Sequence, residues 1–197
     1  MLGGAGQARA VGYRYWSFWD LTGGKWAYAT QGPSTARPSD GDVEGFRFAV
    51  SEDSQDASKP RGAADFASIC AKTPAQQGKK RVALVIDFGT TADAPSGETP
   101  PAARTACARV PSDATTADAL ASVAKPLRYD TNALLCAIAG YPRTGCGEQV
   151  SATKPTASAR SRATATHHGP SVGLLAGAAA VALLGTAAIW QARRRRG

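Results

Sequence analysis

Four cysteines are the residues of this 197-residue chain whose chemistry follows most directly from their spacing. They are Cys70, Cys107, Cys136 and Cys146. An even number of cysteines in an exported domain is typical of disulfide bonds, and four cysteines allow three pairings. Cys136 and Cys146 enclose a short loop, so we expect them to pair, which leaves Cys70 with Cys107. A zinc site is disfavoured because there is no close Cys-x-x-Cys pair and no neighbouring histidine.

Large aromatic side chains are concentrated in one stretch, YRYWSFWDLTGGKWAYA, which covers residues 13–29 and holds three of the four tryptophans. In a strand, successive side chains point to opposite faces, so both faces of this stretch are aromatic. One aromatic set is expected in the core, and the other needs a loop, a partner or a ligand to cover it. If a ligand does so, Trp16 and Trp26, on adjacent strands, are the candidate binding residues.

Acidic residues alternate in the segment SDGDVE, where Asp40, Asp42 and Glu44 are two positions apart. Calcium loops use oxygen ligands at such positions, but the full twelve-residue pattern is missing. Asp-Gly-Asp is also typical of a turn, and we expect a turn here.

Residues for catalysis are scarce before position 151. The only histidines are His167 and His168, and the segment before them has no G-x-S-x-G, P-loop or dinucleotide motif. Ser-His and Cys-His nucleophiles are thereby excluded from residues 11–150. Paired carboxylates could still act as in glycosidases, but nothing singles out a pair. We expect a protein that is not an enzyme, with no catalytic residue, metal or cofactor.

The C-terminal region carries the clearest targeting signal. Residues 171–190, SVGLLAGAAAVALLGTAAIW, are uncharged, and 20 helical residues reach about 30 Å, the thickness of a bilayer core. Val172 and Trp190 mark the expected membrane anchor. Arg193, Arg194, Arg195 and Arg196 follow, and such a basic cluster stays cytoplasmic.

These signals divide the chain into five expected parts. Residues 1–10 resemble the end of a signal peptide, because Ala8-Arg9-Ala10 fits a cleavage site; the hypothesis is that the true start lies upstream. Residues 11–150 are the extracytoplasmic domain, and 151–170 are a Ser/Thr/Ala/Pro-rich flexible stalk. Residues 171–192 are a transmembrane helix and 193–197 a cytoplasmic tail. The protein is expected at the plasma membrane, crossing it once.

Charge argues against nucleic acid as a partner. The chain has a formal net charge of +8, but residues 11–150 hold 15 basic and 15 acidic residues. The excess of basic residues lies near the ends of the chain, in the expected stalk and anchor, so it does not indicate a polyanion-binding surface on the domain.

The pattern of the domain predicts an α+β fold with five to seven strands and two short helices. An aromatic hairpin turns at Gly23 and Gly24. RVALVIDF, residues 81–88, is typical of a strand buried on both faces. Helices are expected around Phe66–Cys70, from the i, i+3, i+4 spacing, and after Thr115, which forms a Thr-x-x-Asp start signal with Asp118.

Two stretches resemble the β-grasp domains at the C-terminus of transcobalamin proteins and in related bacterial surface proteins. One is ATTADALASVAKPLRYDTNALLCAIAGYP, and the other is YWSFWDLTGGKWAYATQGPSTARPSDGDVEGFRF. In that family the helix stretch comes first, so the order is permuted here. The resemblance implies a β-grasp-like mixed sheet.

The whole chain also resembles an uncharacterised family of secreted, C-terminally anchored actinobacterial proteins. The shared motifs are Tyr-Arg-Tyr-Trp-Ser-Phe-Trp, Val-Glu-Gly-x-Arg-Phe and Gly-Tyr-Pro-x-x-Gly-Cys. The genes of that family often neighbour energy-coupling-factor transporter genes. The resemblance implies an accessory to micronutrient uptake, with a cobalamin-like or other small molecule, or transporter components, as partners. The alternative is a cell-surface structural protein that binds another protein or a wall glycan.

Overall fold

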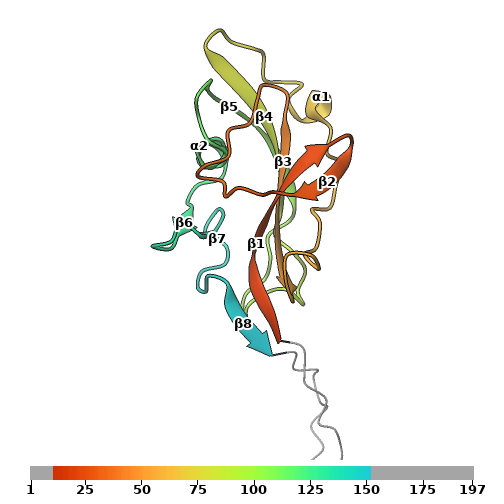
Figure 1. Cartoon of the computed structure of the whole chain (residues 1–197), viewed down its shortest axis with the longest axis vertical. Coiled ribbons are helices and arrows are strands. Elements are labelled where there is room, and N and C mark those ends of the chain that lie inside the picture. The colour runs from red at the N-terminus through yellow and green to blue at the C-terminus, as the bar shows by residue number, and fades with distance from the viewer. Residues whose placement is uncertain (1–10, 152–197) are drawn as a thin grey trace, which may run out of the picture. The chain divides into compact units, whose positions relative to one another are not determined.

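The aromatic N-terminal stretch forms the longest strand of a six-stranded sheet in the computed structural model, which describes residues 11–151 (Figure 1). The strand order is β2-β1-β3-β4-β5, and β8 pairs with the beginning of β1. Two further strands, β6 and β7, pair as a separate ribbon. The expected signal-peptide remnant, the span at 171–192 and the tail at 193–197 lie outside the described residues, as does all but the first residue of the expected stalk.

The strands of the main sheet are β1 Val11–Thr22, β2 Lys25–Tyr28, β3 Val43–Ser51, β4 Lys79–Asp87, β5 Arg104–Pro111 and β8 Glu148–Ser151. The ribbon consists of β6 Arg128–Tyr129 and β7 Leu135–Ala137. Most neighbouring pairs are antiparallel, but β3 and β4 are parallel. A parallel pair needs a crossover, and residues 52–78, which contain α1, supply it.

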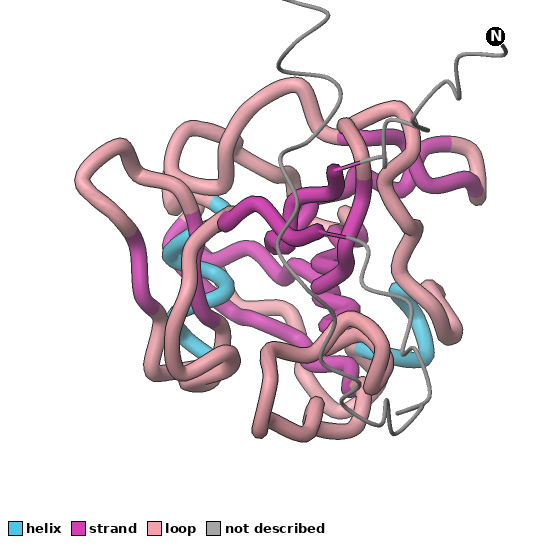
Figure 2. The backbone as a smooth tube through the Cα atoms, turned by 90° about the horizontal axis from the view of Figure 1, so that it is seen from below, coloured by secondary structure: helices cyan, strands magenta, loops and turns pink. Residues whose placement is uncertain are grey.

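Both faces of the sheet are covered, which explains why β4 is apolar without interruption. Val82, Leu84 and Ile86 contribute to the larger core, under α2, whereas Ala83 and Val85 belong to a smaller core with residues of α1. The two helices therefore lie on opposite sides of the strands, as Figure 2 shows. These sides are called the α2 face and the α1 face below.

The two helices form where their start signals predicted them. α2, Thr116–Val123, begins at the N-cap Thr115, and the side chains of Thr115 and Asp118 bond each other's backbone N–H groups in a capping box. It buries Thr116, Ala119 and Leu120. α1, Phe66–Ile69, begins after Asp65, whose carboxylate accepts a hydrogen bond from the Ser68 N–H.

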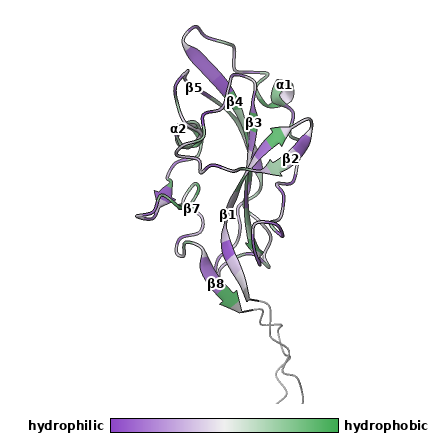
Figure 3. Ribbon diagram, viewed as in Figure 1, coloured by the Kyte–Doolittle hydropathy of each residue, from purple (hydrophilic) through white to green (hydrophobic). Residues whose placement is uncertain are grey.

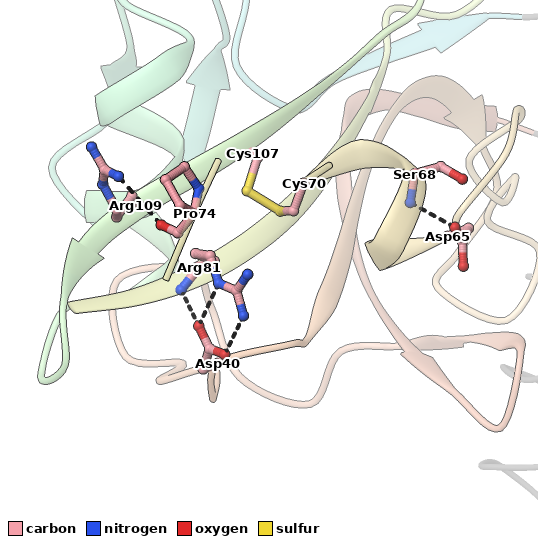
Figure 4. The surroundings of a disulfide bond; sticks show 8 residues. All are labelled: Asp40, Asp65, Ser68, Cys70, Pro74, Arg81, Cys107 and Arg109. Atoms are coloured by element: carbon pink, nitrogen blue, oxygen red, sulfur yellow. Dashed lines mark hydrogen bonds and ion pairs between the residues drawn. A yellow bond between two sulfur atoms is a disulfide. The ribbon is translucent and has the colours of Figure 1, made fainter. Parts of the chain in front are cut away.

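Two disulfide bonds confirm the expected pairing. Cys70, after α1, is bonded to Cys107 on β5, with 5.0 Å between their Cα atoms (Figure 4). Cys136 on β7 is bonded to Cys146, with a Cα separation of 4.5 Å. The first bond fastens the crossover segment to the edge strand of the sheet, and the second closes the loop that leads to β8.

The sequence prediction differs from the structure at the end of the domain. It expected five to seven strands, whereas the described residues form eight, and β8 was not anticipated. β8 is short, and it is held by pairing with β1, from Val11 opposite Ser151 to Arg14 opposite Glu148. The domain thus runs one residue into the segment expected to be stalk. Among residues 11–151, no helix has the length and apolar character needed to cross a membrane.

Polar residues are buried within the sheet as well as apolar ones, and the strands in Figure 3 carry both colours. The buried polar or charged strand residues are Ser17, Glu44, Arg47, Ser51, Lys80 and Asp87. A buried charge requires a partner, so the four charged residues among them raise the question of what neutralises each one.

Candidate functional site

A cavity of about 270 Å³ lies at the end of the sheet where β1 stops and β3 begins. Three segments line it: the end of β1, the connection between β2 and β3, and the first residues of β3. The lining residues that matter to its chemistry are Phe18, Asp20, Leu21, Ala29, Ala36, Arg37, Asp42, Val43 and Glu44. We call this space the Glu44 cavity.

Glu44 is the most deeply buried polar group of the cavity, with 3% of its surface exposed. Its Oε1 accepts a hydrogen bond of 2.7 Å from the Thr116 hydroxyl of α2. Its Oε2 is buried and has no hydrogen-bond donor among the described residues. A buried acceptor without a donor costs roughly 1–3 kcal/mol, and a ligand that brings a donor to this oxygen would recover that cost.

The environment of Glu44 favours its neutral form. The pKa of its carboxyl is raised from 4.5 to about 7, mainly because the group is buried, and the charges of Asp20 and Asp42 contribute to the increase. The hydrogen bond from Thr116 and the charge of Lys80 act in the opposite direction. Near neutral pH the carboxyl therefore exchanges readily between its two forms, as ligand-binding and catalytic carboxyls often do.

Asp20 and Asp42 add two more carboxyls to the cavity. Asp20 on β1 is directly opposite Glu44 in the antiparallel register with β3, so both side chains are on the α2 face. Burial and the nearby charge of Asp42 raise the pKa of Asp20. Asp42 also serves the predicted turn, because its Oδ2 accepts a hydrogen bond of 2.7 Å from the Ser39 N–H.

Asp40, the remaining residue of the acidic segment, is not part of the cavity. Both carboxylate oxygens of Asp40 bond the Arg81 side chain on β4, at 3.1 and 2.9 Å (Figure 4). Asp40, Asp42 and Glu44 thus do not share one site. Among residues 11–151, no group of three or more His, Cys, Asp or Glu side chains is arranged to hold a metal ion.

The wall of the cavity between β2 and β3 is fixed by α2. The Thr116 N–H donates to the Ala36 carbonyl at 3.0 Å, and the Ala117 N–H donates to the Pro33 carbonyl at 2.8 Å. At the other end of this connection, the Ala29 N–H donates to the Phe18 carbonyl at 3.0 Å. The first amides of α2, which have no partner within the helix, thereby hold a preformed cavity in place.

The two basic residues nearest the cavity are already engaged. Lys80 is buried, and its Nζ donates to the carbonyls of Pro38 and Ala114, both at 2.7 Å. Arg37 lines the cavity, but its Nη1 donates to the Asp113 carbonyl. Neither forms an ion pair with Glu44, so the cavity keeps acidic character.

The two tryptophans predicted as ligand-binding residues lie on opposite faces of the sheet. Trp16 is 4% exposed in the larger core, where it packs on Phe48 and Phe88 and donates from Nε1 to the Tyr141 carbonyl. Trp26 is half-buried against the smaller core. Neither lines the Glu44 cavity. Ligand binding by these residues stays a prediction, and it would require the two indoles to act separately.

A second cluster of buried charges occupies the α1 face. Asp87 is fully buried and accepts hydrogen bonds from Arg47 at 2.5 Å and from Arg61 at 2.7 and 2.8 Å. Burial opposes the ionisation of Asp87, but the bonds from Arg61 and Arg47 outweigh it and lower the pKa of this carboxyl to about 2. Both oxygens of Asp87 have donors, so its carboxylate is satisfied by the fold, whereas the buried Arg47 Nε has no acceptor among the described residues.

A family of known proteins matches most of the chain. The model of the family described as SCO2322-like domain matches residues 8–151. The chain belongs to this family. No curated protein and no solved structure matches it. The matched residues include those that line the Glu44 cavity and all four cysteines.

Sequence reasoning missed Glu44 because it interpreted the acidic segment as turn chemistry and did not consider which face of the strand VEGFRFAV this residue occupies. One signal was present: in VEGFRF, Glu44 falls on the same side of an alternating strand as Phe46 and Phe48. A carboxylate at a core-facing position of a strand is unusual, since such residues are almost never fully buried without a partner.

Proposed function

We propose that this chain is a membrane-anchored extracytoplasmic module that binds a small molecule without transforming it, as an accessory to micronutrient uptake. The observation that carries the proposal is the Glu44 cavity, which combines a preformed space with a buried carboxyl oxygen that lacks a donor among residues 11–151. Ligand sites in proteins are such concave spaces with a few convergent polar groups.

The partners of the polar groups around the cavity support binding over catalysis. The Thr116 hydroxyl donates to Glu44, and two backbone carbonyls hold the Lys80 ammonium group. In the described part of the chain, the cavity therefore offers carboxylate acceptors beside apolar side chains.

The extracytoplasmic location is supported by the two disulfide bonds, since these persist in oxidising compartments. The uncharged segment 171–190, followed by four arginines, supports a single membrane span with the domain outside. Val11 and Ser151, the first and last described residues, pair with each other, so a tether that follows Ser151 leaves the domain at one end of β1.

The topology supports the finer proposal of a β-grasp-like sheet in permuted order. β4 and β5 form a hairpin, α2 follows across one face, and β3, which precedes β4 in the chain, lies parallel beside β4. Association with an energy-coupling-factor transporter rests on the family resemblance given above. A corrinoid would not fit inside 270 Å³, so the cavity favours a smaller ligand.

A second candidate function is contact with another surface protein or a wall glycan. The observation that favours it is the exposure of Tyr13 and Tyr28, at 44% and 38%, on the β1–β2 side of the sheet. Tyrosine gives large contact area with a polar tip, as interfaces use it.

A thermal-stability screen of the full chain in detergent tests the two functions. The panel contains corrinoids, smaller vitamins and wall glycan fragments, because a ligand that binds only the native state raises the unfolding temperature. We expect a small vitamin or related metabolite to raise it in the wild type and less in Glu44→Gln, with Asp40→Asn as the charge-matched control. A response to glycan alone that is lost in Tyr13→Ala would favour the second function.

A further inference from the structure

The carboxyl groups of the Glu44 cavity point to a cationic ligand. We infer that this cavity binds the primary ammonium group of a small aliphatic cation through Glu44, Asp20 and Asp42. The inference rests on the proposed function, because it names the chemical class of the small molecule.

The charge of the lining gives the first reason. Three carboxyls line the cavity, and the one basic residue among its lining, Arg37, already donates to the Asp113 carbonyl. Lys80 is close enough to influence Glu44, but its Nζ donates to two backbone carbonyls. The described residues thus leave acidic side chains without a cation to pair with.

The free oxygen of Glu44 gives a second and independent reason. The Thr116 hydroxyl occupies Oε1, whereas Oε2 has no donor among residues 11–151 although only 3% of Glu44 is exposed. An ammonium group has three donors and no acceptor, so one hydrogen can bond Oε2 while the charges of Asp20 and Asp42 attract the group to the cavity. An anion or a group with acceptors alone would leave Oε2 of the ionised carboxylate unsatisfied.

The remaining walls set the size and shape of the ligand. Phe18, Ala29 and Ala36, which belong to or pack against the larger core, supply apolar surface on the same face as the carboxyls. A volume of about 270 Å³ admits a chain of a few carbon atoms and excludes large ring systems. Butylammonium is a suitable probe, because butanol and butyrate match its size and differ from it in charge.

The affinity should depend on pH through Glu44. The charged or polar groups that face it are Asp20 from β1, Asp42 from the turn before β3, Lys80 from β4 and Thr116 from α2. Because the pKa of Glu44 is raised to about 7, the ionised form that attracts a cation becomes dominant between pH 6 and pH 8. We expect the affinity for butylammonium to rise about tenfold over that range.

The experiment is a calorimetric titration of the full chain in detergent with butylammonium, butanol and butyrate at pH 6 and pH 8. Expected are saturable binding of butylammonium alone, a loss of at least tenfold in Glu44→Gln, and a loss of less than twofold in Asp40→Asn. Asp40→Asn removes the same charge at a residue bound to Arg81 outside the cavity. Circular dichroism verifies that both variants fold.

Three results would overturn the inference: no binding of butylammonium, equal binding of all three probes, or binding that Glu44→Gln and Asp40→Asn weaken alike. The proposed function fails separately. If butylammonium does not bind but a neutral or anionic member of the vitamin panel does, small-molecule binding stands and the ammonium site is wrong. If no member of either set binds, both are wrong.

Discussion

Glu44 and Asp87 are buried carboxyls of one sheet with opposite environments. Asp87 receives donors from two arginines, which lower the pKa of its carboxyl to about 2. Glu44 accepts one hydrogen bond, from the Thr116 hydroxyl, and the pKa of its carboxyl is raised to about 7, mainly by burial. The contrast separates a group satisfied by the fold from one that a ligand can satisfy.

Glu44 should make stability fall as pH rises. The unfolded chain loses this proton near pH 4.5, while the native state keeps it to about pH 7, so its contribution is full below pH 4.5 and is lost by pH 7. The loss is on the order of 3 kcal/mol. Asp20, whose pKa is also raised, adds in the same direction. Urea unfolding between pH 4.5 and pH 8 measures how the free energy of unfolding changes with pH, and Glu44→Gln should make this dependence much weaker. An unchanged dependence in the variant would contradict the prediction.

Asp87→Asn should be the more damaging substitution. It leaves Arg47, whose side chain is 6% exposed, without its closest anionic partner. Breaking a buried ion pair typically costs about 3–5 kcal/mol. Urea unfolding at pH 7 measures this loss, with Asp40→Asn at the surface pair with Arg81 as the matched control. An equal loss in the free energy of unfolding for the two substitutions would show that the buried ion pair stabilises the fold no more than the surface pair does.

At the scale of elements, the local signals predicted most of the fold. The apolar run of β4, the glycine turn between β1 and β2 and the start signal of α2 each depend on neighbouring residues, and each element formed as expected. β8 was missed because four residues form a strand here only through pairing with β1. That pairing joins positions more than 130 residues apart, which no local pattern records.

The cavity could not be predicted for the same reason. Its carboxyls meet through the register that sets Asp20 opposite Glu44, and its wall is held by amides of α2 that follow it by about 80 residues. The aromatic stretch invited a ligand interpretation instead, although Trp16 fills the core. Residue type indicated which groups could bind, but only tertiary contacts place them together.

Thr115→Ala should weaken α2 and the wall that it supports. The substitution removes the side-chain half of the capping box, which typically costs about 1 kcal/mol. Because the adjacent amides of Thr116 and Ala117 hold residues 33–36, amide hydrogen exchange in that connection should accelerate as well. Ser122→Ala, near the other end of α2, is the control. A loss of stability with unchanged exchange at residues 33–36 would contradict the supporting role of α2.

At the scale of the whole molecule, the two disulfides should contribute unequally. Cys70–Cys107 spans 37 residues and Cys136–Cys146 spans 10. The loss of chain entropy in the unfolded state predicts about 4 kcal/mol for the first and about 3 kcal/mol for the second. Urea unfolding of the two double Cys→Ser variants tests this order, and a greater loss from removal of the shorter loop would reverse it.

The location of the domain is open to a test in cells. The Cys70–Cys107 disulfide bond should form in an oxidising compartment, and the arginines at 193–196 should lie on the cytoplasmic side. Protease treatment of intact cells should remove the domain and leave the C-terminal segment with the membrane. Protection of the domain in intact cells would contradict this topology.

The most direct test of the central claim is carbon-13 NMR of the Glu44 carboxyl in the full chain at pH 7, titrated with butylammonium. Near its pKa of about 7 the group is close to half ionised, so a bound cation should move its signal toward the ionised position until the site saturates. The Asp40 signal, from a carboxylate paired with Arg81, should stay in place. A Glu44 signal that does not respond, or that moves together with Asp40 without saturating, would contradict a ligand site in this cavity.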